Sequence, residues 1–323
     1  MEKDSVNILC LDGGGIRGLM TADILIHVEK RLNELTNNNK KIGEYFDLIV
    51  GTSTGGILTA IYSIPDSFDN FKYSATDAKD LYLNNGSKIF KRNIFRKIGT
   101  MLGFIKPRYG NKNLKSIIDK YISPNLKISE AKTNIMITSV SLKNSALYLF
   151  KSYNKTYYNN TFKDACVATS AAPTYFPPHK VGNKYLIDGG MALNNPTLSA
   201  YVEAKKLFPN KKLNILSVGT GSKIDDYNDS SVLRRGIIWW VRKIMDITLV
   251  SSSKAVEYQS DVLFRDANIG NYLRIDPIIE KSSEKMDNIS SENVINLIKD
   301  SNNTIKRYKK SIDEFLNKII KEG

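Results

Sequence analysis

Apolar residues near the start of the chain occur in two patterns, short unbroken runs and a longer periodic stretch. Residues 6–11 and 46–50 form runs of strand length, and each leads directly into a glycine-rich turn. Residues 19–35 place leucines and a valine at helical spacing, and residues 56–62 begin a second helix. The order strand, loop, helix, strand, turn, helix predicts an α/β fold with a mainly parallel central sheet flanked by helices.

Further along, the same reading predicts a hairpin, a helix and two more strands. The hairpin is expected over residues 135–142 and 147–151, which are joined by a polar turn. Residues 165–179 begin as a run of small residues and end in prolines, which predicts a helix that the prolines stop. Residues 185–187 and 213–218 are apolar and are expected as strands.

Two segments combine apolar and basic side chains. Residues 88–106 place isoleucine, phenylalanine and methionine on one helical face and lysine and arginine on the other. This segment is either an ordinary surface helix or a flap that touches lipid. Residues 232–247 contain both tryptophans, flanked by arginine and lysine, and are either an interfacial segment or a helix packed on the core.

The C-terminal part is expected to be mainly helical. From about residue 290, isoleucine, valine, tyrosine and phenylalanine recur on one helical face, which predicts a helix that covers the sheet. A boundary near residue 224 would divide a catalytic core, 1–225, from a helical extension, 226–323, that packs on it. The extension can equally belong to the same domain.

The net charge and the two cysteines indicate which partners and which cellular compartment to expect. The 323 residues include 47 lysines and arginines against 33 aspartates and glutamates, a formal net charge of +14. This charge predicts attraction to an anionic partner, namely a phospholipid surface, nucleic acid or an acidic protein, although a compositional bias would give the same excess. Cys10 and Cys166 lie in apolar runs, which favours buried thiols and a reducing compartment.

The ends and the apolar runs predict a cytoplasmic protein that contacts membranes peripherally. The N-terminal residues lack the basic region and long apolar stretch of a signal peptide. No run approaches the roughly 18 apolar residues that a membrane span requires.

The pentapeptide GTSTG, 51–55, follows the second strand and precedes the second helix. This G-x-S-x-G pattern predicts a sharp turn that presents Ser53 at a helix N-terminus, a good position for a nucleophile. The chain has only two histidines, His27 and His179, and no histidine follows residue 179. A triad in the order serine, Asp188, histidine is therefore excluded, and a carboxylate such as Asp188 is the remaining base.

The glycines of residues 12–18 offer consecutive backbone N–H groups that can converge on an oxyanion. Gly13, Gly15 and Gly18 also match G-x-G-x-x-G, the motif typical of dinucleotide-binding proteins. That reading fails because the second strand ends in the serine turn and not in an acidic residue. A P-loop is excluded because no Gly-Lys-Ser/Thr follows, and no cysteine and histidine cluster predicts a metal site.

Four motifs in order resemble the patatin-like phospholipase family. They are DGGGIRG at 12–18, GTSTG at 51–55, ATSAAPTYFPPH at 168–179 and DGGMALNNP at 188–196. Together they span most of the first 225 residues, and four linked motifs are far more specific than one. The resemblance implies a three-layer α/β fold related to cytosolic phospholipase A2, and a Ser–Asp dyad in place of a triad.

The resemblance also assigns roles to individual residues. The family nucleophile falls on Ser53 and the family aspartate on Asp188, and the oxyanion loop falls on Gly13, Gly14 and Gly15. It implies lipid acyl hydrolysis of the phospholipase A or lysophospholipase type, through an acyl-enzyme.

Five further residues are expected to support the site: Arg17, Gly51, Gly55, Gly189 and Gly190. The resemblance implies no metal and no cofactor. The expected partner is a phospholipid surface; nucleic acid is not expected, and the oligomeric state is left open. Two alternatives stay open, an effector phospholipase that a ligand such as a cyclic nucleotide or a protein partner activates, and a basic nucleic-acid-binding protein without catalysis.

Overall fold

The structure is a computed structural model that describes residues 4–90, 107–222 and 234–322. Most of the basic segment 88–106 and the first two residues of the segment 232–247 therefore lie outside the described residues. Within the described chain, no helix has both the length and the apolar character needed to cross a bilayer.

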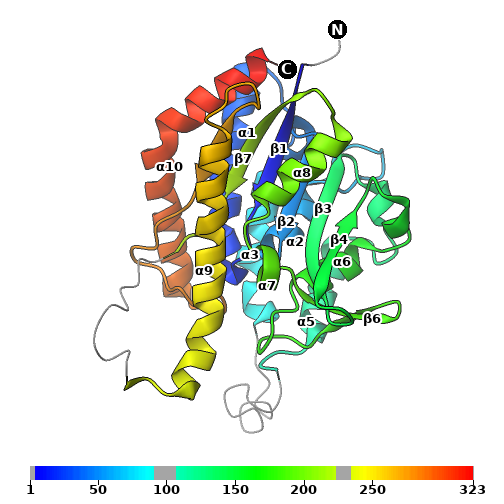
Figure 1. Cartoon of the computed structure of the whole chain (residues 1–323), viewed down its shortest axis with the longest axis vertical. Helices are drawn as coiled ribbons and strands as arrows, with labels where there is room; N and C mark the ends of the chain where they lie inside the picture. Colours follow the sequence, from blue (N-terminus) through cyan, green and yellow to red (C-terminus); the bar gives the residue numbers. More distant parts are fainter. Residues whose placement is uncertain (1–3, 91–106, 223–233, 323) are drawn as a thin grey trace.

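One sheet of eight strands organises the described residues, in the order β5-β6-β3-β2-β1-β7-β8, and the eighth strand, β4, lies off this path and pairs with β3 (Figure 1). The pairs along β3, β2, β1, β7 and β8 are parallel, whereas β4 and β6 run antiparallel to β3 and β5 antiparallel to β6. The strands are β1 (Ser5–Leu11), β2 (Leu48–Thr52), β3 (Asn134–Ser141), β4 (Ala146–Lys151), β5 (His179–Val181), β6 (Lys184–Asp188), β7 (Lys212–Val218) and β8 (Tyr272–Ile275).

Helices cover both faces of the sheet, which gives three layers (Figure 1). Half of the described residues are helical. The α-helices are α1 (Gly18–Thr36), α2 (Thr54–Ile61), α3 (Ala75–Ile89), α5 (Asn111–Tyr121), α6 (Phe162–Thr169), α7 (Gly190–Leu193), α8 (Thr197–Leu207), α9 (Ile237–Leu263) and α10 (Ser291–Lys321). Short 3-10 helices are η1 (Gly15–Arg17), η2 (Ile42–Tyr45), η4 (Ile128–Glu130) and η5 (Lys155–Tyr157).

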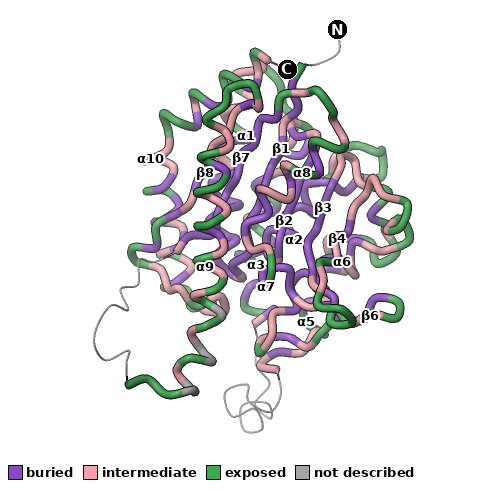
Figure 2. Tube along the Cα trace, in the orientation of Figure 1, coloured by how far each residue is buried: buried purple, intermediate pink, exposed green. Residues whose placement is uncertain are grey.

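The central strands are apolar throughout because both of their faces are buried. In β1, Ile8 and Cys10 join the cluster under α8, whereas Leu9 and Leu11 join the larger cluster under α1, α2 and α10. Figure 2 shows these strands buried along their length. Such a rigid sheet fixes whatever side chains stand at the carboxyl ends of its strands.

The residues after 225 complete this architecture. Strand β8 pairs with β7 and extends the sheet by one strand, and α10 packs along α1. Ile312 and Leu316 of α10 are buried in the larger cluster, and Arg31 of α1 forms an ion pair with Asp313. The C-terminal part therefore shares the core of the first 225 residues.

The structure confirms the predicted α/β class, the mainly parallel sheet and the flanking helices. The hairpin is present as β3 and β4, and the C-terminal helix is present as α10. The helix expected over 165–179 is displaced: α6 ends at Thr169, and His179 begins strand β5. Strand β8 was not foreseen, since its four residues are too short to leave a periodic pattern.

Candidate active site

Ser53 stands between the end of β2 and the start of α2, in a backbone conformation that serine rarely adopts. Its φ is 54° and its ψ is −120°, and such strain costs on the order of 1–3 kcal/mol. The surrounding structure holds this conformation, because the Ser53 N–H donates a hydrogen bond to Thr169 Oγ1 at 2.8 Å. The side chain is thereby turned out of the strand.

Gly51 and Gly55 make this turn sterically feasible. A Cβ on Gly51 would lie 2.2 Å from the carbonyl oxygen of Gly55, and a Cβ on Gly55 would lie 2.2 Å from that of Leu11. Both contacts are with backbone atoms, which cannot rotate away. The glycines are needed because the backbone passes so closely here.

The order of the strands in the sheet places Asp188 beside Ser53, although the two residues are 135 positions apart in the sequence. It ends β6, where it pairs with Ser139 of β3, and β3 is the neighbour of β2. Ser53 Oγ donates a hydrogen bond of 2.6 Å to Asp188 Oδ2, and the Gly190 N–H donates one of 2.7 Å to Oδ1. Each carboxylate oxygen of Asp188 thus has one defined partner.

Burial alters the acidity of this carboxyl group. Asp188 is only 5% exposed, and burial raises its pKa from the ordinary 3.8 to about 7, although the hydrogen bonds from Ser53 and Gly190 act in the opposite direction. A carboxylate with such a pKa is a far better proton acceptor than one in water, because its basicity is matched to neutral pH.

Gly189 is excluded from carrying a side chain by the neighbouring strand. A Cβ on it would lie 2.1 Å from Thr138 Oγ1 and 2.6 Å from the Thr138 carbonyl oxygen. This close approach fixes the backbone directly after Asp188. The aspartate is therefore held from both sides, by β3 pairing before it and by this glycine after it.

The glycine loop after β1 lies beside Ser53, since a Cβ on Gly13 would be 3.2 Å from Ser53 Cβ. The Gly13 N–H donates to the Asn194 carbonyl oxygen at 3.2 Å. Within the described residues, the N–H groups of Gly14 and Gly15 donate to no acceptor. Two adjacent backbone donors of the glycine loop are thus available, and Gly15 lines the same pocket as Ser53.

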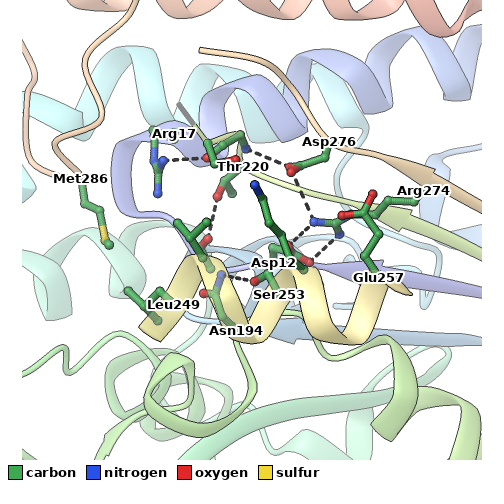
Figure 3. A pocket seen from close by; sticks show the side chains of 15 residues that line it. Asp12, Arg17, Asn194, Thr220, Leu249, Ser253, Glu257, Arg274, Asp276 and Met286 are labelled. Carbon is green, nitrogen blue, oxygen red and sulfur yellow. Dashed lines mark hydrogen bonds and ion pairs between the residues drawn. The ribbon is translucent and has the colours of Figure 1, made fainter. Parts of the chain in front are cut away.

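Hydrogen bonds from Arg17 link the glycine loop to the turn that follows β7. Its Nη1 donates to the Gly221 carbonyl oxygen at 2.7 Å and its Nε to that of Gly14 at 3.4 Å. Thr220 Oγ1 donates to the Gly13 carbonyl oxygen at 2.6 Å (Figure 3). Since the Arg17 guanidinium binds backbone carbonyls of two loops, it fixes their relative position.

A buried ion pair anchors the base of the glycine loop. Arg274 of β8 contacts both carboxylate oxygens of Asp12, at 2.6 and 2.9 Å (Figure 3). It also donates a hydrogen bond to Ser217 Oγ. Burial raises the Asp12 pKa to about 6, against the opposing effect of Arg274. Removing either partner of such a pair leaves a buried charge uncompensated, which typically costs about 3–5 kcal/mol.

An apolar pocket of about 70 Å³ opens from Ser53 and Asp188 on the side of α3. Tyr175 and Met286 line this pocket together with Ser53 and Asp188. Thr54 and Ser170 also line it, and most of the remaining wall is aliphatic or aromatic, with the side chains of Ile16, Ile57, Leu81, Ile89, Leu114 and Phe176. An apolar cavity beside a serine and an aspartate suits an ester with a hydrocarbon chain.

Comparison with known proteins identifies the family. The family model described as patatin-like phospholipase matches residues 9–201 of this chain. The chain belongs to the patatin-like phospholipase family. The match contains the glycine loop, Ser53 and Asp188, and membership supports lipid acyl hydrolase activity in general terms.

Plant relatives extend the patatin-like match beyond residue 201. The chain is 35% identical to Patatin-like protein 1 of Oryza sativa subsp. indica, over 84% of this chain and 73% of that protein. It is 33% identical to Patatin-like protein 1 of Arabidopsis thaliana, over 91% and 80%. A protein of Solanum tuberosum named "Probable inactive patatin-3-Kuras 1" is 29% identical, over 94% and 87%.

Among solved structures, the chain is similar to VipD from Legionella pneumophila. The two share 12% identity with a TM-score of 0.45, over 95% of this chain and 67% of that one. Because this score is below 0.5, the patatin-like assignment rests on the family model and the plant relatives.

The structure brings the predicted residues of the patatin-like motifs together at one edge of the sheet. Ser53, Asp188 and the glycine loop meet there, whereas the two histidines lie elsewhere. His179 Nε2 is 2.8 Å from Asp164 Oδ1, which ties β5 to α6, and His27 lies on α1. Among the described residues, no group of three or more histidine, cysteine or acidic side chains could hold a metal ion.

Arg274, Asn194 and Thr220 were missed by sequence reasoning. The sequence offers one indication for Arg274: it is the only charged residue among Tyr272–Ile275, and an arginine buried in an apolar strand requires a partner. Asn194 and Thr220 act on the glycine loop through one carbonyl and one hydroxyl, and such contacts leave no trace in a pattern of apolar residues.

Proposed function

We propose that this protein hydrolyses fatty-acyl esters of membrane lipids, with Ser53 as nucleophile and Asp188 as base. The observation that carries the proposal is the 2.6 Å hydrogen bond from Ser53 Oγ to Asp188 Oδ2, two residues that line an apolar pocket. Cleavage is of the phospholipase A or lysophospholipase type, and the enzyme contacts the membrane peripherally.

In the first step Ser53 Oγ attacks the ester carbonyl carbon, and its proton passes to Asp188 Oδ2. The carbonyl oxygen becomes an oxyanion, which accepts hydrogen bonds from the free N–H groups of Gly14 and Gly15. The tetrahedral intermediate collapses, the bond to the alcohol oxygen breaks, and this oxygen takes the proton from Asp188. An acyl ester on Ser53 and a free alcohol result.

In the second step water hydrolyses the acyl ester. Asp188, again ionised, accepts a proton from the water as its oxygen attacks the acyl carbon. The new oxyanion is held by the same two N–H groups, and its collapse breaks the bond to Ser53 Oγ. The serine recovers the proton from Asp188, and a fatty acid leaves.

The proposal is tested by mass spectrometry of the products from liposomes of mixed phospholipids. We expect free fatty acids and lysophospholipids, and a fluorophosphonate that modifies activated serines should label the peptide that contains Ser53 while stopping product release. Release of phosphorylated head groups or of diacylglycerol, with no fatty acid, would contradict acyl hydrolysis.

Replacing both histidines should leave most of the activity. A His27→Ala/His179→Ala variant is expected to hydrolyse a water-soluble ester at near the wild-type rate, because neither histidine hydrogen-bonds to Ser53 or Asp188. It should be less stable, since His179 no longer binds Asp164. Steady-state kinetics and thermal unfolding measure the two effects. A folded but inactive double variant would refute the dyad.

Gly14→Ala should reduce kcat while the protein stays folded. A Cβ at Gly14 would lie 2.1 Å from Thr220 Oγ1 and 2.5 Å from Thr220 Cβ, so the glycine loop must shift and its donors move. Loss of one oxyanion donor typically reduces kcat by about 100-fold to 1,000-fold. Kinetics with a soluble ester measure this. Gly236→Ala is the control, because nothing lies within 4 Å of its Cβ position; equal rates for both variants would contradict the assigned donors.

A further inference from the structure

Helix α9 connects the candidate active site to a part of the surface that extends past it. Its middle is fixed at the site, because Ser253 Oγ accepts a hydrogen bond of 2.9 Å from Asn194 Nδ2. Leu249 Cδ2 lies 3.1 Å from the position of a Cβ on Gly190 (Figure 3). The helix begins twelve residues before Leu249, which places its first turn about 18 Å further along the axis.

This first part of α9 extends beyond the carboxyl ends of the strands, where Ser53 and Asp188 lie (Figure 1). Leu249 and Ser253 line one cavity with Gly13, so α9 passes beside the glycine loop, and its start lies on the side of the molecule where the parallel strands end. A surface that the start of α9 touches is thus brought to the side of the molecule on which β2 ends and Ser53 lies.

Large apolar side chains are exposed on this projecting part. Trp240 is 41% exposed and Ile244 is 55% exposed, and the two positions are four apart, so they lie on the same helical face. The ring of Trp239 packs edge-on against that of Trp240 at 5.0 Å between centroids. Exposed apolar groups of this size mark an interaction surface when they occur together.

Basic side chains accompany them. Arg234 and Arg235 are exposed directly before the helix, and Lys243 lies one residue before Ile244. The Arg235 guanidinium stands over the Trp239 ring at 5.8 Å. One acidic residue, Asp246, is also exposed in this stretch, so the described side chains carry an excess of positive charge. Tryptophan beside arginine and lysine is the combination found at the boundary between lipid head groups and acyl chains.

We propose that Arg234, Arg235, Trp240 and Ile244 form a docking surface for an anionic phospholipid bilayer. This inference rests on the proposed function, because it specifies how that site meets its substrate. Trp240 and Ile244 enter the head-group region, and the arginines bind lipid phosphates and anionic head groups. The net charge of +14 adds long-range attraction to the same surface. Bound in this way, the protein places the mouth of the apolar pocket next to the bilayer.

The other end of α9 provides a matched control. Tyr258 is 68% exposed and Val262 is 42% exposed, so their exposure is similar to that of Ile244 and Trp240. They are again four residues apart, but the acidic Glu257 and Asp261 precede them. These residues lie on the far side of Leu249 from the projecting start. Membrane docking through the start of α9 predicts that they do not contribute.

The test compares Trp240→Ser/Ile244→Ser with Tyr258→Ser/Val262→Ser in the full-length chain. Each variant is sedimented with vesicles of phosphatidylcholine alone or mixed with phosphatidylglycerol, and its hydrolysis of vesicle lipid and of a soluble p-nitrophenyl ester is measured. We expect the first variant to lose about tenfold or more in affinity for mixed vesicles and a similar factor in vesicle hydrolysis, with unchanged activity on the soluble ester. The second variant should match wild type in all three assays.

Arg234→Gln/Arg235→Gln tests the charge separately. It should remove most of the preference for phosphatidylglycerol, and wild-type binding should weaken as salt rises, because screened charges attract the surface less. Equal wild-type binding to neutral and anionic vesicles would overturn the proposal.

Three further results would also overturn the proposal: equal binding losses in both serine variants, loss of soluble-ester activity in the first, or a change in its oligomeric state. Failure of the proposed function gives a different result, in which wild type sediments with mixed vesicles through α9 but releases no fatty acid.

Discussion

Ser53→Ala is expected to reduce ester hydrolysis by about 10,000-fold or more. In the proposed mechanism the substitution removes the oxygen that forms the acyl ester, and it leaves in place the N–H groups of Gly14 and Gly15, which donate to no acceptor among the described residues. What remains is slow attack by water near those donors, because serine nucleophiles contribute about a millionfold when they act as a unit with their base. Initial rates on a soluble ester and on vesicles measure the loss.

A serine at the other end of the same helix provides the control. Ser63 follows α2, and its buried Oγ donates to the Thr59 carbonyl oxygen at 2.8 Å. Ser63→Ala disturbs the helix by one hydrogen bond, worth about 1 kcal/mol, and should keep its activity. Retention of more than a tenth of the rate by pure Ser53→Ala would mean that Asp188 activates water directly, without an acyl-enzyme.

The local features of this site could be predicted from sequence because each is encoded within a few residues. One apolar run and two glycines predict the strand that ends at Thr52, the turn at Ser53 and the helix after it. The glycine loop follows β1 in the same way. The Ser53 and Asp188 pairing was inferred from a family resemblance and from the lack of a suitable histidine.

Contacts that depend on strand order could not be predicted. Asp12 and Arg274 are 262 residues apart and meet only because β7 lies between β1 and β8 in the sheet. Nothing near Arg274 indicates which carboxylate it binds. The same holds for the strand conformation of His179, because the three-residue strand β5 forms only by pairing with β6. In both cases the neighbours come from distant parts of the chain.

Asp188→Asn is expected to abolish most activity and, at alkaline pH, to stabilise the fold. Asparagine fits the same space, since its oxygen can accept from the Gly190 N–H and its amide can donate to Ser53 Oγ. It cannot take a proton, so hydrolysis should fall by about 1,000-fold or more. Asp47→Asn, at the opposite end of β2, removes a carboxylate that binds the Asn7 N–H and should remain active.

The pH profile of the wild type follows from the same carboxyl group. In the proposed mechanism only ionised Asp188 accepts the serine proton, and burial raises the pKa of this carboxyl group to about 7. We therefore expect kcat/KM to rise with pH through about 7 and then level off. A profile that rises near the ordinary pKa of 3.8 would show that Asp188 titrates as if exposed, and would contradict its role as a base tuned by burial.

Stability should change in the opposite sense. Between the ordinary pKa of 3.8 and the folded value of about 7, the native protein keeps a proton that the unfolded chain has lost. The free energy of unfolding therefore falls as pH rises through this window, by at most about 1.4 kcal/mol per pH unit from this group. The free energy of unfolding of Asp188→Asn does not fall in this window, because asparagine does not titrate.

Urea unfolding should find the variant more stable than wild type near about pH 8, by on the order of 1–4 kcal/mol, with the difference shrinking as pH falls toward about 4. A constant difference across that range would mean that the ionised carboxylate is not penalised by burial, and the base would then lack the basicity that the mechanism assigns to it.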